Sequence, residues 1–235
     1  MKREVLDGLL AARAARRPIA RLSWLTGGRE QLVEPGAGDL EAALAEAVAR
    51  ALDADGAVLA ESEDGPVFVH PFNPPLRLAI VGAVHIAQHL SELTSRLGYD
   101  VTVVDPRRGF LTEARFPGVA LDARWPDEAL EAFSLDARSA VVTLSHDAKI
   151  DEPALLVALR SEAFYVGALG SRRTQEKRRV RLLDAGLSAA ELDRIHGPVG
   201  LDLGGRSPAE IALSVAAELT ATLRGRGRGR GKSAA

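Results

Sequence analysis

The sequence contains no cysteine at all. This absence excludes disulfides, thiolate metal ligands, thiol nucleophiles and carriage of persulfide sulfur by this chain. Aromatic residues are scarce, at 4% of 235 residues. No apolar run approaches the roughly 20 residues that a membrane-spanning helix needs, and the first residues lead into no stretch typical of a signal peptide. We therefore expect a cytoplasmic protein without a membrane partner.

The chain also has no large net charge of either sign. The 30 Lys and Arg residues against 32 Asp and Glu residues give a formal net charge of -2, so nucleic acid is not expected as a partner. The exception is the alternating glycine and arginine segment 224–232, which cannot bury apolar surface and repels itself. We expect residues 225–235 to form a disordered tail. The hydrophobic share of 46% is enough for a real core elsewhere.

Residues 1–75 have the pattern of a small α+β domain. Apolar residues at helical spacing are followed by two strand-like segments, and Asp39 is placed to cap an amphipathic helix. A second hairpin is predicted over residues 58–69. Pro74 and Pro75 then interrupt regular structure, and we expect the domain boundary there.

Residues 76–224 alternate apolar strands with helical segments, which predicts a Rossmann-like, doubly wound parallel sheet in an α/β fold. In such a sheet the ligand binds at the carboxyl ends of the strands, where the winding direction switches. The predicted strands are 77–81, 101–105, 119–121, 140–144 and 164–169. The predicted helices are 84–97, 126–133, 152–162, 171–186, 188–196 and 207–223.

The first of these strands ends in a turn similar to a dinucleotide-binding fingerprint. Gly82 suits the tight turn, Ala87 can replace the third glycine, and Asp105 stands where a carboxylate accepts from ribose hydroxyls. Val84 occupies the position of the second glycine, which disfavours ordinary NAD binding. A phosphate can still bind the free N–H groups of the following helix. The alternative is a turn that binds nothing.

Other polar residues follow the second and fourth strands. Arg107 could clamp phosphate or carboxylate, although a solvated surface arginine is equally compatible. His146 is a candidate for proton transfer or for contact with a heterocycle, and Asp147 either orients it or caps the next helix. A catalytic relay from Ser145, His146 and Asp147 is disfavoured because adjacent side chains diverge.

Metal binding is the least favoured use of the histidines. His85 and His89 are four residues apart on one predicted helix face, a spacing compatible with a metal ion shared with His146. No acidic ligand accompanies them, so we expect no metal site. His85 remains a candidate for contact with a bound cofactor.

The fifth strand leads into the best candidate anion site. Gly170 permits a sharp turn, Ser171 can cap the basic helix that follows, and Arg172 or Arg173 would face a bound anion. An ordinary capped helix with a solvated basic face is the alternative. Because the turn is expected to be exposed, Gly170→Val should impair ligand retention more than folding.

A glycine-dense segment, residues 197–205, precedes the last helix. Its glycines permit close backbone approach, while Asp202 and Arg206 supply an acceptor and a donor beside it. Ser207 and Glu210 form a capping box, so that end of the motif is architectural.

These motifs, in this order, resemble the xanthine dehydrogenase accessory protein (XdhC/CoxI) family. The resemblance rests on Ile-Val-Gly-Ala-Val-His from Ile80, Val-Val-Asp-Pro-Arg from Val103, Tyr-Val-Gly-Ala-Leu-Gly-Ser-Arg-Arg-Thr from Tyr165 and Gly-Pro-Val-Gly-Leu-Asp-Leu-Gly-Gly-Arg-Ser-Pro from Gly197. It covers residues 73–223. Many relatives carry a cysteine-containing amino-terminal motif that is absent here, so this is a short, cysteine-free form.

The resemblance implies a maturation factor that binds molybdopterin-type molybdenum cofactor as cargo and delivers it to an apo molybdenum hydroxylase such as xanthine dehydrogenase. Sulfur would come from a separate sulfur-donating protein. No catalytic residue is implied. The candidate cofactor contacts are Gly82, His85, Asp105, Arg107, His146, Asp147, Gly170, Ser171, Arg172, Arg173 and Asp202.

Two other functions remain open on the sequence. An NAD(P)-dependent oxidoreductase is favoured by the sheet and Asp105 and disfavoured by Val84, and no hydride-transfer residues stand out. A docking module without cofactor is the third class. A homodimer is compatible with the small first domain, whose core is incomplete, but the sequence does not decide it.

Overall fold

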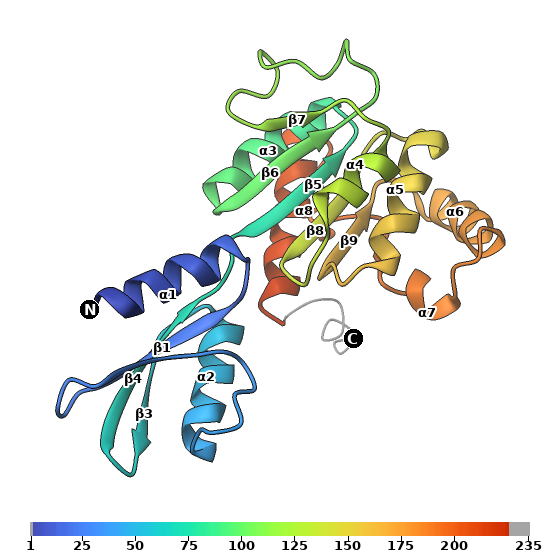
Figure 1. The fold of residues 1–235 in the computed structure, drawn as a ribbon. Helices are drawn as coiled ribbons and strands as arrows, with labels where there is room; N and C mark the ends of the chain where they lie inside the picture. Colours follow the sequence, from blue (N-terminus) through green and yellow to red (C-terminus); the bar gives the residue numbers. More distant parts are fainter. Residues whose placement is uncertain (1, 226–235) are drawn as a thin grey trace. The chain divides into compact units, whose positions relative to one another are not determined.

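The computed structural model describes residues 2–225, and the chain divides into two compact units, residues 1–74 and 75–235. The predicted disordered tail lies, from residue 226 onward, outside the described residues. Within the described part of the chain, no helix has the length and apolar character needed to cross a membrane. Figure 1 shows the ribbon of each unit.

The first unit is an antiparallel sheet with helices, as predicted. Its strands lie in the order β2-β1-β4-β3, and Leu22, Val67 and Val69 of this sheet pack against Leu44 and Val48 of α2. The predicted cap at Asp39 is wrong, because α2 begins three residues later with Glu41 at the N-cap and without a capping side chain. The elements are α1 (Arg3–Ala14), β1 (Ile19–Trp24), β2 (Glu30–Val33), α2 (Ala42–Ala54), β3 (Val58–Ser62) and β4 (Gly65–Phe72).

The second unit contains a parallel sheet in the order β10-β9-β8-β5-β6-β7, which confirms the predicted Rossmann-like fold. Its strands are β5 (Leu76–Val81), β6 (Tyr99–Val104), β7 (Ala120–Asp122), β8 (Ser139–Thr143), β9 (Tyr165–Ala168) and β10 (Ile195–His196). Its helices are α3 (His85–Arg96), α4 (Pro126–Phe133), α5 (Ala148–Arg160), α6 (Arg172–Asp184), α7 (Ala189–Leu192) and α8 (Pro208–Leu223).

Two apolar cores fill the two faces of this sheet. Alternate residues of the buried strands point to opposite faces, so Leu78 and Ile80 pack under α3 and α8, whereas Ala79 and Val81 pack under α4 and α5. Figure 1 shows these two pairs of helices on opposite faces. The sheet is buried on both sides, and ligands can reach it only at its ends.

One predicted element is wrong. The sequence predicts a helix over 188–196, but α7 ends at Leu192 and Ile195 begins a short strand, β10. Ile195 packs on the core beneath α5, and its backbone pairs with Val166 of β9. Periodicity cannot separate a strand of this length from the end of a helix, because both place one apolar residue on the core.

The winding direction switches at β5. The chain passes from β5 to β6 and β7 on one side, and then returns to build β8, β9 and β10 on the other. The carboxyl ends of β5, β6, β8 and β9 therefore meet at one end of the sheet, which we call the carboxyl edge. Parallel α/β sheets bind their ligands at this position.

Candidate cofactor-binding site

The turn after β5 is built around a close backbone approach. Gly82 has φ +106°, and a Cβ placed on it would lie 2.7 Å from the backbone nitrogen of Ser145. Only glycine combines this conformation with this approach. Ala87 is fully buried where α3 meets the sheet, and the half-buried Val84 packs against the same core. Gly82 therefore joins the ends of β5 and β8 at the switch point.

The first turn of α3 is open to an anion. Val84 occupies its N-cap, and among residues 2–225 no side chain caps this helix. The helices that follow β8, β9 and β10 are different: Asp147 caps α5, Ser171 caps α6 and Ser207 caps α8. The leading N–H groups of α3 thus keep their capacity to donate, and the helix dipole favours a negative group there.

Asp105, at the end of β6, is fully buried and fully engaged. Its Oδ2 accepts from the Ala83 backbone N–H at 2.7 Å and from Arg107 Nη2 at 2.8 Å. Its Oδ1 accepts from the Nε and the backbone N–H of Arg107, each at 2.9 Å. The carboxylate is 0% exposed and presents no free oxygen to a ribose hydroxyl or a ring edge. In this structure it positions the turn and Arg107.

Burial disfavours the charged form of Asp105, but the hydrogen bonds from Arg107 and from the Ala83 and Arg107 backbone outweigh it, so the pKa of Asp105 lies below its ordinary value. The folded state then binds this proton more weakly than the unfolded state does. The resulting stability is present above the unfolded pKa and is lost as pH falls through the folded pKa.

We expect Asp105→Asn to lower the free energy of unfolding by about 2 kcal/mol at neutral pH, because it leaves Arg107 without its buried partner. The deficit should shrink on acidification, since the wild-type carboxylate then loses its advantage. Urea unfolding at several pH values measures both effects. Asp100→Asn, an exposed carboxylate on the same strand, is the control. A deficit independent of pH would contradict this role of the carboxylate.

The segment after β8 places His146 and Asp147 at the surface. His146 has φ +62°, a conformation that few residues other than glycine adopt, and such backbone outliers cluster at functional sites. Asp147 accepts from the Lys149 N–H at 2.9 Å and so caps α5, one of its two predicted roles. The Ser145 hydroxyl donates to Asp151 Oδ1 at 2.6 Å and accepts from the Asp147 backbone N–H at 3.1 Å, so its contacts are not with the side chains of His146 and Asp147. The disfavoured Ser-His-Asp relay is not formed.

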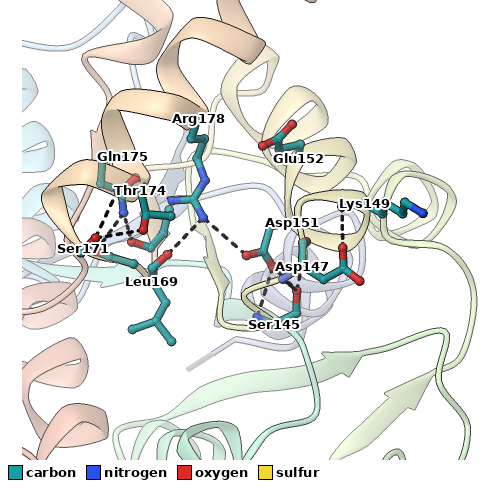
Figure 2. Close-up of polar contacts among 12 residues, drawn as sticks. Ser145, Asp147, Lys149, Asp151, Glu152, Leu169, Ser171, Thr174, Gln175 and Arg178 are labelled. Carbon is teal, nitrogen blue, oxygen red and sulfur yellow. Dashed lines mark hydrogen bonds and ion pairs between the residues drawn. The ribbon is translucent and has the colours of Figure 1, made fainter.

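A buried ion pair, absent from the sequence prediction, connects the ends of β8 and β9 (Figure 2). Asp151 of α5 accepts from the backbone N–H and hydroxyl of Ser145, and its Oδ2 lies 3.5 Å from Arg178 Nη2. Arg178 of α6 also donates to the Leu169 carbonyl at 3.1 Å. Both charged side chains are buried, with exposed fractions of 4% for Arg178 and 1% for Asp151. The pair thus fixes the two segments that carry His146 and Gly170.

Desolvation dominates this ion pair. Burial raises the pKa of the Asp151 carboxyl, against the hydrogen bonds from Ser145 and the charge of Arg178. Burial likewise lowers the pKa of Arg178, against the charge of Asp151. Each group gains less from its partner than it loses by leaving water, as is common for buried pairs. The pair orients the carboxyl edge rather than adding to stability.

The turn after β9 carries the predicted anion site. Ser171 accepts from the Thr174 N–H at 3.2 Å, which leaves one fewer free N–H group than in α3. Arg172 and Arg173 are exposed, and no carboxylate of residues 2–225 pairs with them. That Gly170→Val impairs ligand retention more than folding stays a prediction, but the structure adds a cost to folding. Gly170 has φ +137°, and a Cβ on it would lie 2.9 Å from Thr174 Cγ2, so any side chain strains the turn.

The glycine-dense loop, residues 197–205, is held by a hydrogen bond to a buried carboxylate of α8. Glu218 of α8 accepts from the Gly200 N–H and from the Tyr165 hydroxyl, each at 2.7 Å. His196 lies beside it, with Nδ1 3.3 Å from Glu218 Oε1 and its ring 4.4 Å from that of Tyr165. Asp202 is exposed on the loop beyond this anchor.

The sequence-predicted residues therefore lie in the segments that follow β5, β6, β8, β9 and β10 of the parallel sheet. Some of these residues have exposed side chains, whereas others, such as Asp105, are buried and hydrogen-bonded to other residues of the chain. Among residues 2–225, no group of three or more His, Asp or Glu side chains could hold a metal ion, so His85, His89 and His146 do not converge. The exposed candidates are His85, His146, Asp147, Ser171, Arg172, Arg173 and Asp202, and Arg107 is partly exposed.

Comparison with known proteins shows to which family the second unit is similar. Residues 78–219 match the XdhC Rossmann domain. The chain is 34% identical over 148 residues to the molybdenum cofactor insertion chaperone PaoD of Escherichia coli K12, covering 63% of this chain and 40% of PaoD. It is 30% identical over 157 residues to a probable xanthine dehydrogenase subunit of Bacillus subtilis 168, covering 66% of this chain and 46% of that protein.

The fold is also found in a crystal structure described as a xanthine dehydrogenase from Bacillus halodurans, with a TM-score of 0.69 and 24% identity. That match covers 98% of this chain and 67% of the solved one. The chain spans less than half the length of the two curated relatives. The matched region begins within β5 and ends within α8, it includes the turns of the carboxyl edge described above, and by this Rossmann domain the chain belongs to the XdhC family.

Proposed function

We propose that this protein binds a molybdopterin-type molybdenum cofactor at the carboxyl edge and acts as an accessory protein in the maturation of xanthine dehydrogenase-type enzymes. The observation that carries the proposal is the uncapped first turn of α3 at the switch point, together with the exposed Arg172 and Arg173 at the turn after β9, which pair with no carboxylate of residues 2–225. Phosphate is the anion that such a combination suits. The relative PaoD, which is named as a molybdenum cofactor insertion chaperone, supports the choice of cofactor.

The proposed arrangement uses the two halves of the edge differently. The cofactor phosphate binds the first turn of α3 and the guanidinium groups of Arg172 and Arg173. The pterin ring lies toward β8 and β9, where His146 and Asp202 present exposed polar groups to ring edges. Gly82 and Gly170 let the turns after β5 and β9 pack closely against Ser145 and Thr174, and in this way they shape the edge to which the ligand would bind.

The proposed partners follow from the chemistry of the chain. A carrier needs a recipient, and we propose an apo molybdenum hydroxylase. Because the sequence contains no cysteine, the terminal sulfur of the cofactor must come from a separate sulfur-donating protein. We propose binding and transfer, without catalysis by this chain, as the activity.

Ligand-dependent thermal unfolding tests this function. We expect molybdopterin to raise the melting temperature, because a ligand that binds only the folded state stabilises it, whereas NAD and NADP should not. Stabilisation by a nicotinamide cofactor alone would instead favour the oxidoreductase. Stabilisation by neither would favour a docking module.

The same measurement locates the site. The double variant Arg172→Ala/Arg173→Ala should weaken molybdopterin binding about tenfold or more, since each charged hydrogen bond to phosphate contributes about 1.5–3 kcal/mol. Arg13→Ala/Arg50→Ala, which removes two exposed arginines of the first unit, is the matched control and should bind as the wild type does. Equal affinity in the two double variants would remove these arginines from the site.

A further inference from the structure

We infer that Glu218 is a positioning residue for the proposed ligand site: it fixes the glycine-dense loop 197–205 and thereby holds the Asp202 carboxylate where a ligand can reach it. The inference rests on the proposed function, because it assigns a role in binding at the same edge. The sequence did not single out Glu218, which lies within α8. The contacts on the two sides of its carboxylate carry the inference.

The Glu218 carboxylate is buried and is oriented by two strands of the sheet. Its Oε2 accepts from the hydroxyl of Tyr165, in β9, at 2.7 Å, and its Oε1 lies 3.3 Å from Nδ1 of His196, in β10. The side chain is only 1% exposed. Burying a carboxylate costs free energy, and the groups that replace its hydration also fix its direction. One oxygen of Glu218 is therefore held in a defined place next to the loop.

The loop contacts this oxygen at Gly200. The Gly200 N–H donates to Oε2 of Glu218 at 2.7 Å. Gly200 has φ +94°, and a Cβ placed on it would lie 3.2 Å from the Ser214 carbonyl carbon and still closer to the Ser214 hydroxyl. The next residue, Leu201, donates its N–H to the Ser214 carbonyl at 3.2 Å. Only glycine suits this conformation and this approach, so the loop is held against α8 at this point.

A tight turn follows, with Asp202 at its centre. The Leu203 N–H donates to the Leu201 carbonyl at 2.9 Å, which is the hydrogen bond from residue i+2 to residue i of a γ-turn. The end of the loop is held as well, because the Arg206 N–H donates to the Glu210 carboxylate at 2.8 Å. The exposed turn that carries Asp202 is therefore fixed on both sides.

The Asp202 carboxylate is free for a ligand. It makes no hydrogen bond or ion pair with any residue of the described range 2–225. The other two carboxylates among the predicted contacts, Asp105 and Asp147, accept hydrogen bonds from other residues of the chain. A carboxylate accepts hydrogen bonds from the amino and amide N–H groups of a pterin ring. Holding this acceptor in place before the ligand arrives lowers the entropy cost of binding, which is the role of Glu218.

A double-mutant cycle on ligand binding tests the inference. Anaerobic titration of the full chain with molybdopterin should show about tenfold weaker binding in Asp202→Ala and in Glu218→Ala. Because Glu218 acts through Asp202, the double variant should also bind about tenfold more weakly, not about a hundredfold. Glu218→Ala combined with Arg172→Ala/Arg173→Ala is the matched control. Its two losses should multiply, since these arginines lie at the turn after β9.

Hydrogen exchange at single amides separates positioning from general unfolding. In Glu218→Ala the Gly200 N–H should exchange about tenfold faster or more, whereas the amides of Leu78 and Ile80 in β5 should stay protected. Glu218→Gln keeps an acceptor for Gly200, so its exchange and its molybdopterin affinity should both match the wild type. If Glu218→Ala does not fold, Glu218→Asp replaces it in both measurements, because its shorter side chain withdraws the carboxylate from the loop.

The outcomes separate this inference from the proposed function. If the wild type binds molybdopterin, wild-type affinity in Glu218→Ala, or multiplied losses in its combination with Asp202→Ala, would overturn the inference alone. Loss of protection in β5 together with the loop would also overturn it, because Glu218 would then serve general stability. If the wild type binds no molybdopterin and Glu218→Ala still frees the Gly200 amide, the proposed function fails and only the anchoring of the loop stands.

Discussion

Gly82→Ala should be among the most damaging single substitutions in the second unit, lowering the free energy of unfolding by about 3–5 kcal/mol. The added Cβ would lie 2.7 Å from the Ser145 nitrogen and 2.9 Å from its Cα, and both are backbone atoms that cannot rotate away. The φ of +106° adds backbone strain for any L-residue with a side chain. Equilibrium unfolding in urea measures the loss.

Gly98→Ala is the matched control. Gly98 has φ +87°, but nothing lies within 4 Å of a Cβ placed on it. It should therefore cost only the backbone strain, about 1 kcal/mol. Similar losses at the two glycines would mean that the approach of the β5 turn to Ser145 does not matter, and the described junction of β5 with β8 would be wrong.

The second large effect is expected at the buried ion pair. Arg178→Met should cost about 3–5 kcal/mol, because it leaves the buried Asp151 carboxylate without its positive partner. Burial already raises the pKa of Asp151, so the folded state binds this proton more tightly than the unfolded state. Stability in the variant should accordingly fall as pH rises through the window between the unfolded and folded pKa values.

A double-mutant cycle with Asp151→Asn separates charge from packing. Asparagine keeps an acceptor for Ser145 and removes the buried charge, so Arg178→Met should cost less in the Asp151→Asn background than in the wild type. Urea unfolding of the four proteins at neutral pH gives the coupling energy. Strictly additive losses would show that the pair does not interact.

The parallel sheet could be predicted from the sequence because its strands are short apolar runs bounded by turn residues. β5 and β8 lie at the centre, where burial on both faces requires such runs. Their order then fixed the carboxyl edge, and with it the region of Gly82, His146 and Gly170. The sequence did not predict β10, because a strand of two residues is too short to show the alternation of apolar and polar residues that is typical of strands.

The partners of the buried polar side chains at the carboxyl edge could not be predicted from the sequence. Arg178 lies in a run of basic residues typical of a solvated helix face, and only the packing of α6 on α5 buries it against Asp151. Asp105 was located correctly, but the sequence could not show that Arg107 folds back onto it. In both cases the partner is set by three-dimensional packing, which neither composition nor spacing encodes.

The central claim is that the carboxyl edge binds a phosphorylated pterin. Its most direct test is anaerobic purification of the chain from cells that make molybdenum cofactor, followed by mass analysis of the ligand released on denaturation. We predict a molybdopterin species in the wild-type protein, retained in Arg13→Ala/Arg50→Ala and depleted in Arg172→Ala/Arg173→Ala. A wild-type protein that carries no pterin, or an equal amount in all three proteins, would contradict the account.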